Sequence, residues 1–199
     1  MSLVRKATDA DLPNIMAIAN VCFPHSIYWS IGNESAYKFW KFSINAEVSE
    51  VWLCENSKGV QGFSLNILNA KDWTNLIYEF KISIFKKLVL AFHNPKRGYL
   101  FVRKAFEKKY NFDLPVYSPF PLDPVLFVDL FAVAPSSRRN GVASKLVIRN
   151  IERAYQLNRK SVLYSVDRDN LPMLKLMLKH KFVPVAGSRR QVTFAGKIA

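Results

Sequence analysis

The chain has 199 residues, of which 50% are hydrophobic, and it carries a formal net charge of +14 at pH 7. This length and apolar content allow one domain with a full core, and no Gly- or Ser-rich linker divides the sequence. No run reaches the roughly 18 apolar residues of a membrane-spanning helix, and the first residues lack the apolar stretch of a signal peptide. We therefore expect a single domain over residues 1–199, located in the cytoplasm.

The first third of the chain predicts a strand, two helices and a pair of strands. Residues 3–7 predict a short strand, and Thr8, followed by acidic residues, is typical of the cap that begins a helix. A second helix is predicted over residues 34–45. Residues 51–55 and 60–67 then predict two strands joined by a tight turn.

The middle of the chain is both basic and apolar. From Lys71 to Phe112, ten Lys or Arg residues stand against three Asp or Glu residues, a net charge of +7 and half the total of the chain. Apolar residues follow helical spacing over residues 73–88, and residues 99–110 predict a second basic helix. We therefore predict a basic, amphipathic helical insertion over about residues 69–123.

Three interpretations of this insertion stay open. Its apolar face can pack on the rest of the domain or on a second subunit, so the protein is a monomer or a homodimer. Its lysines, among them Lys81, Lys86 and Lys87, can instead hold the protein on the inner, anionic surface of a membrane. The third interpretation is an acidic ligand such as a sugar nucleotide; nucleic acid is the weakest candidate, because base-reading motifs are absent.

The stretch over residues 128–146 predicts a strand, a basic turn and a helix. The first turn of that helix has amides without intrahelical acceptors, and together with the helix dipole, Arg138 and Arg139 they can bind a phosphate. Gly141 and Ala143 lack bulky side chains, so the backbone can approach such a ligand closely. The spacing fits neither a Walker A loop nor a dinucleotide-binding fingerprint.

The last third of the chain continues the alternation of predicted strands and helices. Residues 161–166 predict a strand, residues 171–180 have apolar residues at helical spacing, and Phe182 begins another strand. Asn170 directly precedes the helix, where its side chain can act as the N-cap.

These motifs together resemble a known family. Arg138, Gly141 and Ala143 stand at the spacing of the pattern (Q/R)xxGx(G/A), and Val133-x-Pro135 precedes them. The chain thereby resembles the GNAT superfamily of acyl-CoA N-acyltransferases. The resemblance implies an α/β (α+β) fold with a central, mixed but mostly antiparallel twisted sheet flanked by helices. The helical insertion would lie between the third and fourth strands.

The resemblance also implies a cofactor site for acetyl-CoA or another acyl-CoA. One strand would run beside the pantetheine and polarise the thioester carbonyl, the following turn would hold the pyrophosphate, and Asn170 would contact the pantetheine unless it serves only as a cap. The implied cofactor-binding residues are Phe131, Ala132, Val133, Arg138, Arg139, Asn140, Gly141, Val142, Ala143, Ser144 and Asn170. No metal site is expected, because His25, His93 and His180 are scattered singly.

Two positions depart from the family pattern. Met177 stands where the family often has a tyrosine that protonates the departing thiolate, and a thioether cannot donate a proton. Tyr164 is our candidate for a replacement acid, and Ser165 and His180 are nearby in sequence. Lys181 stands where the family usually has glycine, so the turn before Phe182 is expected to be built differently.

The chemistry that the resemblance implies is transfer of an acetyl or other short acyl group to a primary amine by direct attack in a ternary complex. Asp129, four residues before Val133, is the candidate base, although a reference pKa of about 3.9 makes it weak unless its surroundings raise the pKa. A purely structural carboxylate is the alternative. The alternative for the whole chain is a non-catalytic module that binds CoA, or a membrane or protein partner, through the insertion. Cys22 and Cys54 are expected to be reduced thiols of the core.

Overall fold

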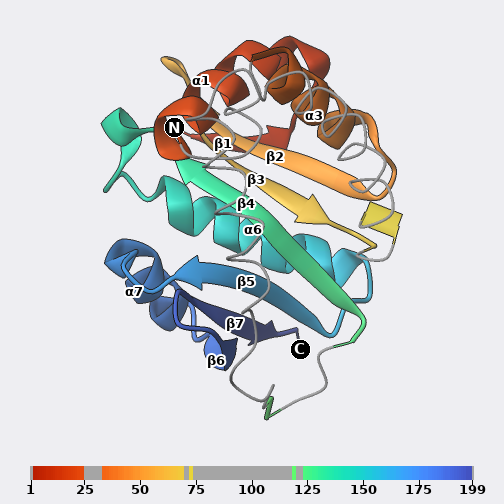
Figure 1. The fold of residues 1–199 in the computed structure, drawn as a ribbon, viewed down its shortest axis with the longest axis vertical. Coiled ribbons are helices and arrows are strands. Elements are labelled where there is room, and N and C mark those ends of the chain that lie inside the picture. The colour runs from red at the N-terminus through yellow and green to blue at the C-terminus, as the bar shows by residue number, and fades with distance from the viewer. Residues whose placement is uncertain (1, 25–32, 70–71, 74–117, 120–122, 199) are drawn as a thin grey trace, which may run out of the picture.

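The structure is a computed structural model that describes residues 2–24, 33–69, 72–73, 118–119 and 123–198. Its centre is a seven-stranded sheet with the order β1-β2-β3-β4-β5-β7-β6 (Figure 1). Neighbouring strands are antiparallel except β4 and β5, which are parallel, so the predicted mixed, mostly antiparallel sheet is confirmed. The strands are β1 (Leu3–Lys6), β2 (Ser49–Asn56), β3 (Gly59–Ile67), β4 (Val125–Val133), β5 (Ser161–Asp167), β6 (Val183–Gly187) and β7 (Gln191–Lys197).

Four α-helices lie within the described residues, and they agree with the predicted helices. They are α1 (Leu12–Cys22), α3 (Asn33–Asn45), α6 (Val142–Gln156) and α7 (Leu171–Lys179). The predicted cap at Thr8 is one turn early for α1, because Thr8 and Asp11 first form a capping box around a short 3-10 turn. None of the described helices is long and apolar enough to cross a membrane.

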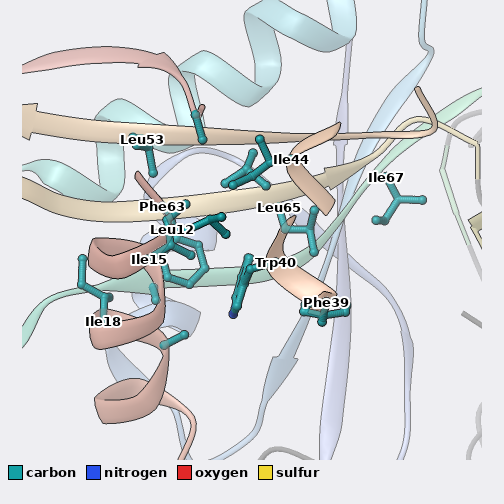
Figure 2. Packing of buried hydrophobic residues seen from close by; sticks show 14 of the residues in the cluster. Leu12, Ile15, Ile18, Phe39, Trp40, Ile44, Leu53, Phe63, Leu65 and Ile67 are labelled. Atoms are coloured by element: carbon teal, nitrogen blue, oxygen red, sulfur yellow. The ribbon is translucent and has the colours of Figure 1, made fainter. Parts of the chain in front are cut away.

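One face of the sheet is covered by α1 and α3. Strand residues alternate between the two faces of a sheet, so Leu53 of β2 and Phe63 and Leu65 of β3 point to the same side. Figure 2 shows Leu12, Ile15 and Ile18 of α1 and Phe39, Trp40 and Ile44 of α3 directed at them. Trp73 belongs to this cluster too, with its ring stacked on Phe42 at 5.9 Å between centroids. Trp40 and Trp73 are thus core residues.

The opposite face is covered by α6 and α7. Val147 and Ala154 of α6 and Met177 of α7 are buried against the inward-facing residues of β4, β5 and β7. This cluster contains Leu126, Val128, Val162, Tyr164, Val166, Phe182 and Phe194. The two helices therefore share one hydrophobic layer, and that layer fixes the position of α7 relative to the start of α6.

Both helices of this face end in a Schellman motif, although neither ends with glycine. After α7, the amide of Lys181 donates to the carbonyl of Leu178 and the amide of Phe182 donates to that of Met177, both at 3.0 Å. Lys181 has a φ of 60°, the left-handed conformation that glycine adopts most easily. The expectation that this turn is built differently was wrong: the backbone takes the glycine-type turn with a lysine in it.

Candidate active site

Strands β4 and β5 begin side by side and then separate. Their parallel pairing covers four residues of each strand and ends where Val128 lies opposite Tyr164. Beyond that pair, β4 continues to Val133 and β5 to Asp167, and Figure 1 shows their arrowheads diverging. In the described sheet, the facing edges of these two strand ends therefore have no strand partner. We call them the open edges of β4 and β5.

A β-bulge at Asp129 marks the point of separation. On the other side of β4, Asn66 pairs with Val128 and Leu65 pairs with Leu130, so Asp129 is the extra residue. A bulge bends its strand and increases the local twist. The bend therefore turns β4 away from β5 just beyond their last pair, and it leaves the Asp129 side chain exposed at this point.

The backbone of β4 presents polar groups along its open edge. The amide of Ala134 donates to the carbonyl of Gln61 on β3 at 2.8 Å, and in an antiparallel pair successive residues face opposite sides. Ala132 therefore directs its amide and carbonyl toward β3. Phe131 and Val133 direct theirs away from β3, toward the end of β5. Phe131 thus offers its backbone amide and carbonyl to a ligand and Val133 offers its amide, whereas the carbonyl of Val133 accepts from Arg138.

The turn after β4 leads directly into α6. Arg139 and Gly141 both have left-handed backbones, with φ of 64° and 74°. The first bond of the helix ladder is donated by the amide of Lys145 to the carbonyl of Gly141, at 3.1 Å. The amides of residues 142–144 come before this bond, so the helix supplies no acceptor for them. They and the positive end of the helix dipole make this turn suited to a phosphate.

Gly62 on β3 allows the end of β4 and the start of α6 to lie this close together. A Cβ atom at this position would lie 2.6 Å from the carbonyl oxygen of Ala132 and 3.2 Å from both the Cα of Val133 and a methyl of Val142. Any side chain here would push the strand or the helix away. Sequence reasoning missed Gly62, because its neighbours come from parts of the chain far away in sequence.

Arg138 and Cys22 lie at the end of β4. The Nε of Arg138 donates to the carbonyl of Val133 at 3.4 Å, and the Cys22 thiol lies 3.6 Å from the same oxygen. Arg138 therefore braces the end of β4, whereas Arg139 is exposed beside the free amides. Cys22 and Cys54 are free thiols, but only Cys54 is fully buried.

The comparisons with known proteins agree with this geometry. Residues 114–182 match the model of the acetyltransferase (GNAT) family, a segment that includes β4, the turn, α6, β5 and α7. This segment of the chain is therefore similar to the GNAT family. The sequence matches none of the curated proteins.

Solved structures of other proteins share the fold of this chain. An N-acetyltransferase from Staphylococcus aureus superposes with a TM-score of 0.63 at 15% identity, covering 100% of this chain and 99% of that one. The ribosomal-protein-S18-alanine N-acetyltransferase of Escherichia coli gives 0.61 at 12%, covering 100% and 95%. A protein from Salmonella typhimurium, described as an acetyltransferase with its cofactor acetyl-CoA, gives 0.59 at 13%, covering 100% and 94%.

Helix α7 begins shortly after the end of β5, which forms one of the open edges. Asn170 is its N-cap, and the Asn170 side-chain oxygen accepts the amide of Met173 at 3.2 Å. The capping function predicted for Asn170 is therefore confirmed, and its side-chain amide can still donate to a ligand. Met177 is completely buried in the layer between α7 and the sheet.

Tyr164 belongs to a buried polar network beneath the bulge. The side chain of Asn150 on α6 accepts from Ser64 at 3.1 Å and from Asn66 at 2.9 Å, and it donates to the Tyr164 hydroxyl at 2.8 Å. All four residues are buried. Burial raises the pKa of Tyr164 well above its usual range, and the bond from Asn150 offsets only part of that rise. We call these residues the Asn150 network; it ties α6 to β3 and β5, on either side of β4.

His180 lies at the other end of α7, where its Nε2 is 3.1 Å from the hydroxyl of Ser144. Burial, and then the charge of Lys179, lower the pKa of His180. Among the residues that the structure describes, no group of three His, Cys, Asp or Glu could hold a metal ion. Most of the predicted helical insertion lies outside the described residues, and of the basic segment from Lys71 to Phe112 the structure describes only Asp72 and Trp73.

Proposed function

We propose that this protein is an N-acyltransferase that moves an acetyl or other short acyl group from acyl-CoA to a primary amine. The observation that carries this proposal is the position of the open edges of β4 and β5 beside the free amides of α6. Coenzyme A combines an extended arm containing two amides with a pyrophosphate. A strand edge suits the arm, and a helix N-terminus suits the pyrophosphate.

The cofactor would lie along β4 with its thioester near the bulge. The backbones of Phe131 and Val133 would bond the pantetheine and polarise the thioester carbonyl, and the turn over residues 139–144 would bind the pyrophosphate. Asn170 would donate its side-chain amide to the pantetheine from the opposite side. Acetyl-CoA is the natural first candidate, because the similar Salmonella protein was solved with it.

The reaction that this geometry supports is direct attack. The amine nitrogen bonds to the acyl carbon, the carbon–sulfur bond breaks, the amine loses a proton and CoA leaves as a thiolate that must gain one. Asp129, exposed at the bulge, is the proposed base, acting directly or through a water. Met177 cannot supply the second proton. Tyr164 was the predicted donor, but its raised pKa makes it hold its proton tightly.

The direct test is release of free thiol from acetyl-CoA in the presence of primary amines. The panel includes small amines and peptides with a free N-terminus, since the similar E. coli enzyme modifies a ribosomal-protein alanine. We expect at least one amine to accelerate thiol release. With Asp129→Asn, the rate at saturating amine should fall by about 10²-fold or more between pH 6 and 9. Full turnover by this variant would reject Asp129 as the base.

A second candidate function is a non-catalytic GNAT module that binds CoA. Two observations favour it: the buried thioether at Met177, and the bond that holds the Tyr164 hydroxyl to Asn150. This candidate predicts CoA binding without thiol release for any amine. Contact of the basic insertion with an anionic membrane remains a separate prediction, which flotation with vesicles containing anionic lipid would test.

A further inference from the structure

His180 places a titratable group next to the free amides of α6. It is the C-cap of α7, and its Nε2 lies 3.1 Å from the Ser144 hydroxyl. Ser144 is the third residue of α6, so its own amide is one of those without an intrahelical acceptor. The hydrogen bond between the two side chains therefore brings the imidazole to the site that suits a phosphate.

The charged residues next to His180 and Ser144 in the sequence are positive. Lys179 precedes it on α7, and Lys145 follows Ser144 on α6 but directs its ammonium to the carbonyl of Ser2 at 3.5 Å. Within the described residues, neither Lys179 nor Arg139 has a carboxylate at ion-pair distance. The dipole of α6 adds its positive end here. Burial, and then the charge of Lys179, lower the pKa of His180 in the free protein, and a bound anion would offset the repulsion.

On the basis of the proposed CoA site, we propose that His180 is a cofactor-binding residue that gains a proton and donates a hydrogen bond to a phosphate of CoA. Nε2 is engaged with the Ser144 hydroxyl, which can donate to it or accept from it, so Nδ1 is the ring nitrogen left to donate to the phosphate. Protonation gives this donor a positive charge. A hydrogen bond between charged partners is about twice as strong as one between neutral partners. Binding of CoA and protonation of His180 therefore favour each other, and CoA binds more tightly as the pH falls.

The test compares wild type with His180→Asn, which suits a helix C-terminus and cannot be protonated. Affinities for CoA are measured by calorimetry from pH 5.5 to 8, and each is expressed as the ratio of wild type to variant. This ratio cancels the titration of the ligand and of other groups. We expect it to rise on the order of tenfold from pH 8 to 5.5, the effect of a pKa one unit higher in the complex. Lys175→Gln, an exposed change on the same helix, should give a constant ratio.

Two further measurements complete the design. The same series with 3′-dephospho-CoA identifies the phosphate: a ratio that still changes with pH supports contact with the pyrophosphate, and one that becomes constant supports contact with the 3′-phosphate. Titrations near pH 6.5 in buffers of different ionisation enthalpy should show proton uptake by wild type and less by His180→Asn. If the ratio of wild-type to His180→Asn affinity for CoA does not change with pH, the assignment of His180 is overturned, although the protein still binds CoA. If wild type binds no CoA at any pH, the proposed function fails as well.

Discussion

Two residues other than glycine stand at helix-ending positions whose left-handed backbone favours glycine. Lys181 and Asn158 occupy the same position in the Schellman motifs that end α7 and α6, with φ of 60° and 53°. Asparagine tolerates this conformation better than lysine does. We expect Lys181→Gly to raise the free energy of unfolding by about 1 kcal/mol and Asn158→Gly to raise it less. Urea denaturation measures both, and a destabilised Lys181→Gly would contradict the geometry.

The ion pairs of Arg5 predict how stability depends on pH. Arg5 bonds both oxygens of Asp11, at 2.7 and 2.8 Å, and this lowers the pKa of Asp11 to about 2. A carboxyl with a lowered pKa stabilises the fold above its unfolded pKa, and this stability disappears as the pH falls from about 4 to about 2. Arg5→Met should lower stability at neutral pH by about 1–2 kcal/mol, allowing for the partial exposure of Arg5, and should flatten this pH dependence. If wild type and Arg5→Met lose the same free energy of unfolding as the pH falls from about 4 to about 2, the prediction is refuted.

At the scale of elements, the close approach of β3, β4 and α6 depends on Gly62. A Cβ atom on Gly62 would overlap the β4 backbone, so Gly62→Ala must shift the strand that borders the proposed cofactor site. We expect it to lower stability by about 1–3 kcal/mol and to weaken CoA binding. Gly196→Ala is the matched control, because its Cβ would meet the Phe182 ring at 2.7 Å on the far side of β5. Similar CoA affinities in both variants would argue against a site along β4.

The Asn150 network holds α6 across β4 at the bulge, and Tyr164→Phe removes one of its bonds without removing the ring. The Asn150 amide would lose its acceptor, which should lower stability by about 1–3 kcal/mol. If Tyr164 serves the fold, turnover per folded molecule should stay within a few-fold of wild type. A fall of about 10²-fold or more in kcat, at unchanged KM, would instead establish Tyr164 as the proton donor.

At the scale of the molecule, local patterns in the sequence predicted most of the elements. The strand, turn and helix around Gly141 were recognisable because glycine, arginine and apolar residues stand at fixed spacing over a short segment. Strand β7 (Gln191–Lys197) was not predicted, since polar residues and Gly196 interrupt its apolar pattern.

The geometry of the site was less predictable than its motifs. The bulge at Asp129 is invisible in the sequence because apolar residues flank it on both sides, so alternation cannot locate the extra residue. Asn150 and His180 are connected to the site only by tertiary contacts, to β3, β5 and Ser144. Single polar residues in apolar surroundings carry no spacing signal, and their function appears only once the fold brings them together.

The central claim is that the open edges of β4 and β5 and the start of α6 form a site for acyl-CoA, and titration with acetyl-CoA tests it most directly. Ala143→Glu places a negative charge in the first turn of α6, where it suits the helix but repels the pyrophosphate, and Ile148→Glu places the same charge on the exposed surface of that helix. We predict that wild type and Ile148→Glu bind one acetyl-CoA per chain with similar affinity and that Ala143→Glu binds at least about tenfold more weakly. Absence of binding by wild type, or equal binding by Ala143→Glu, would contradict the claim.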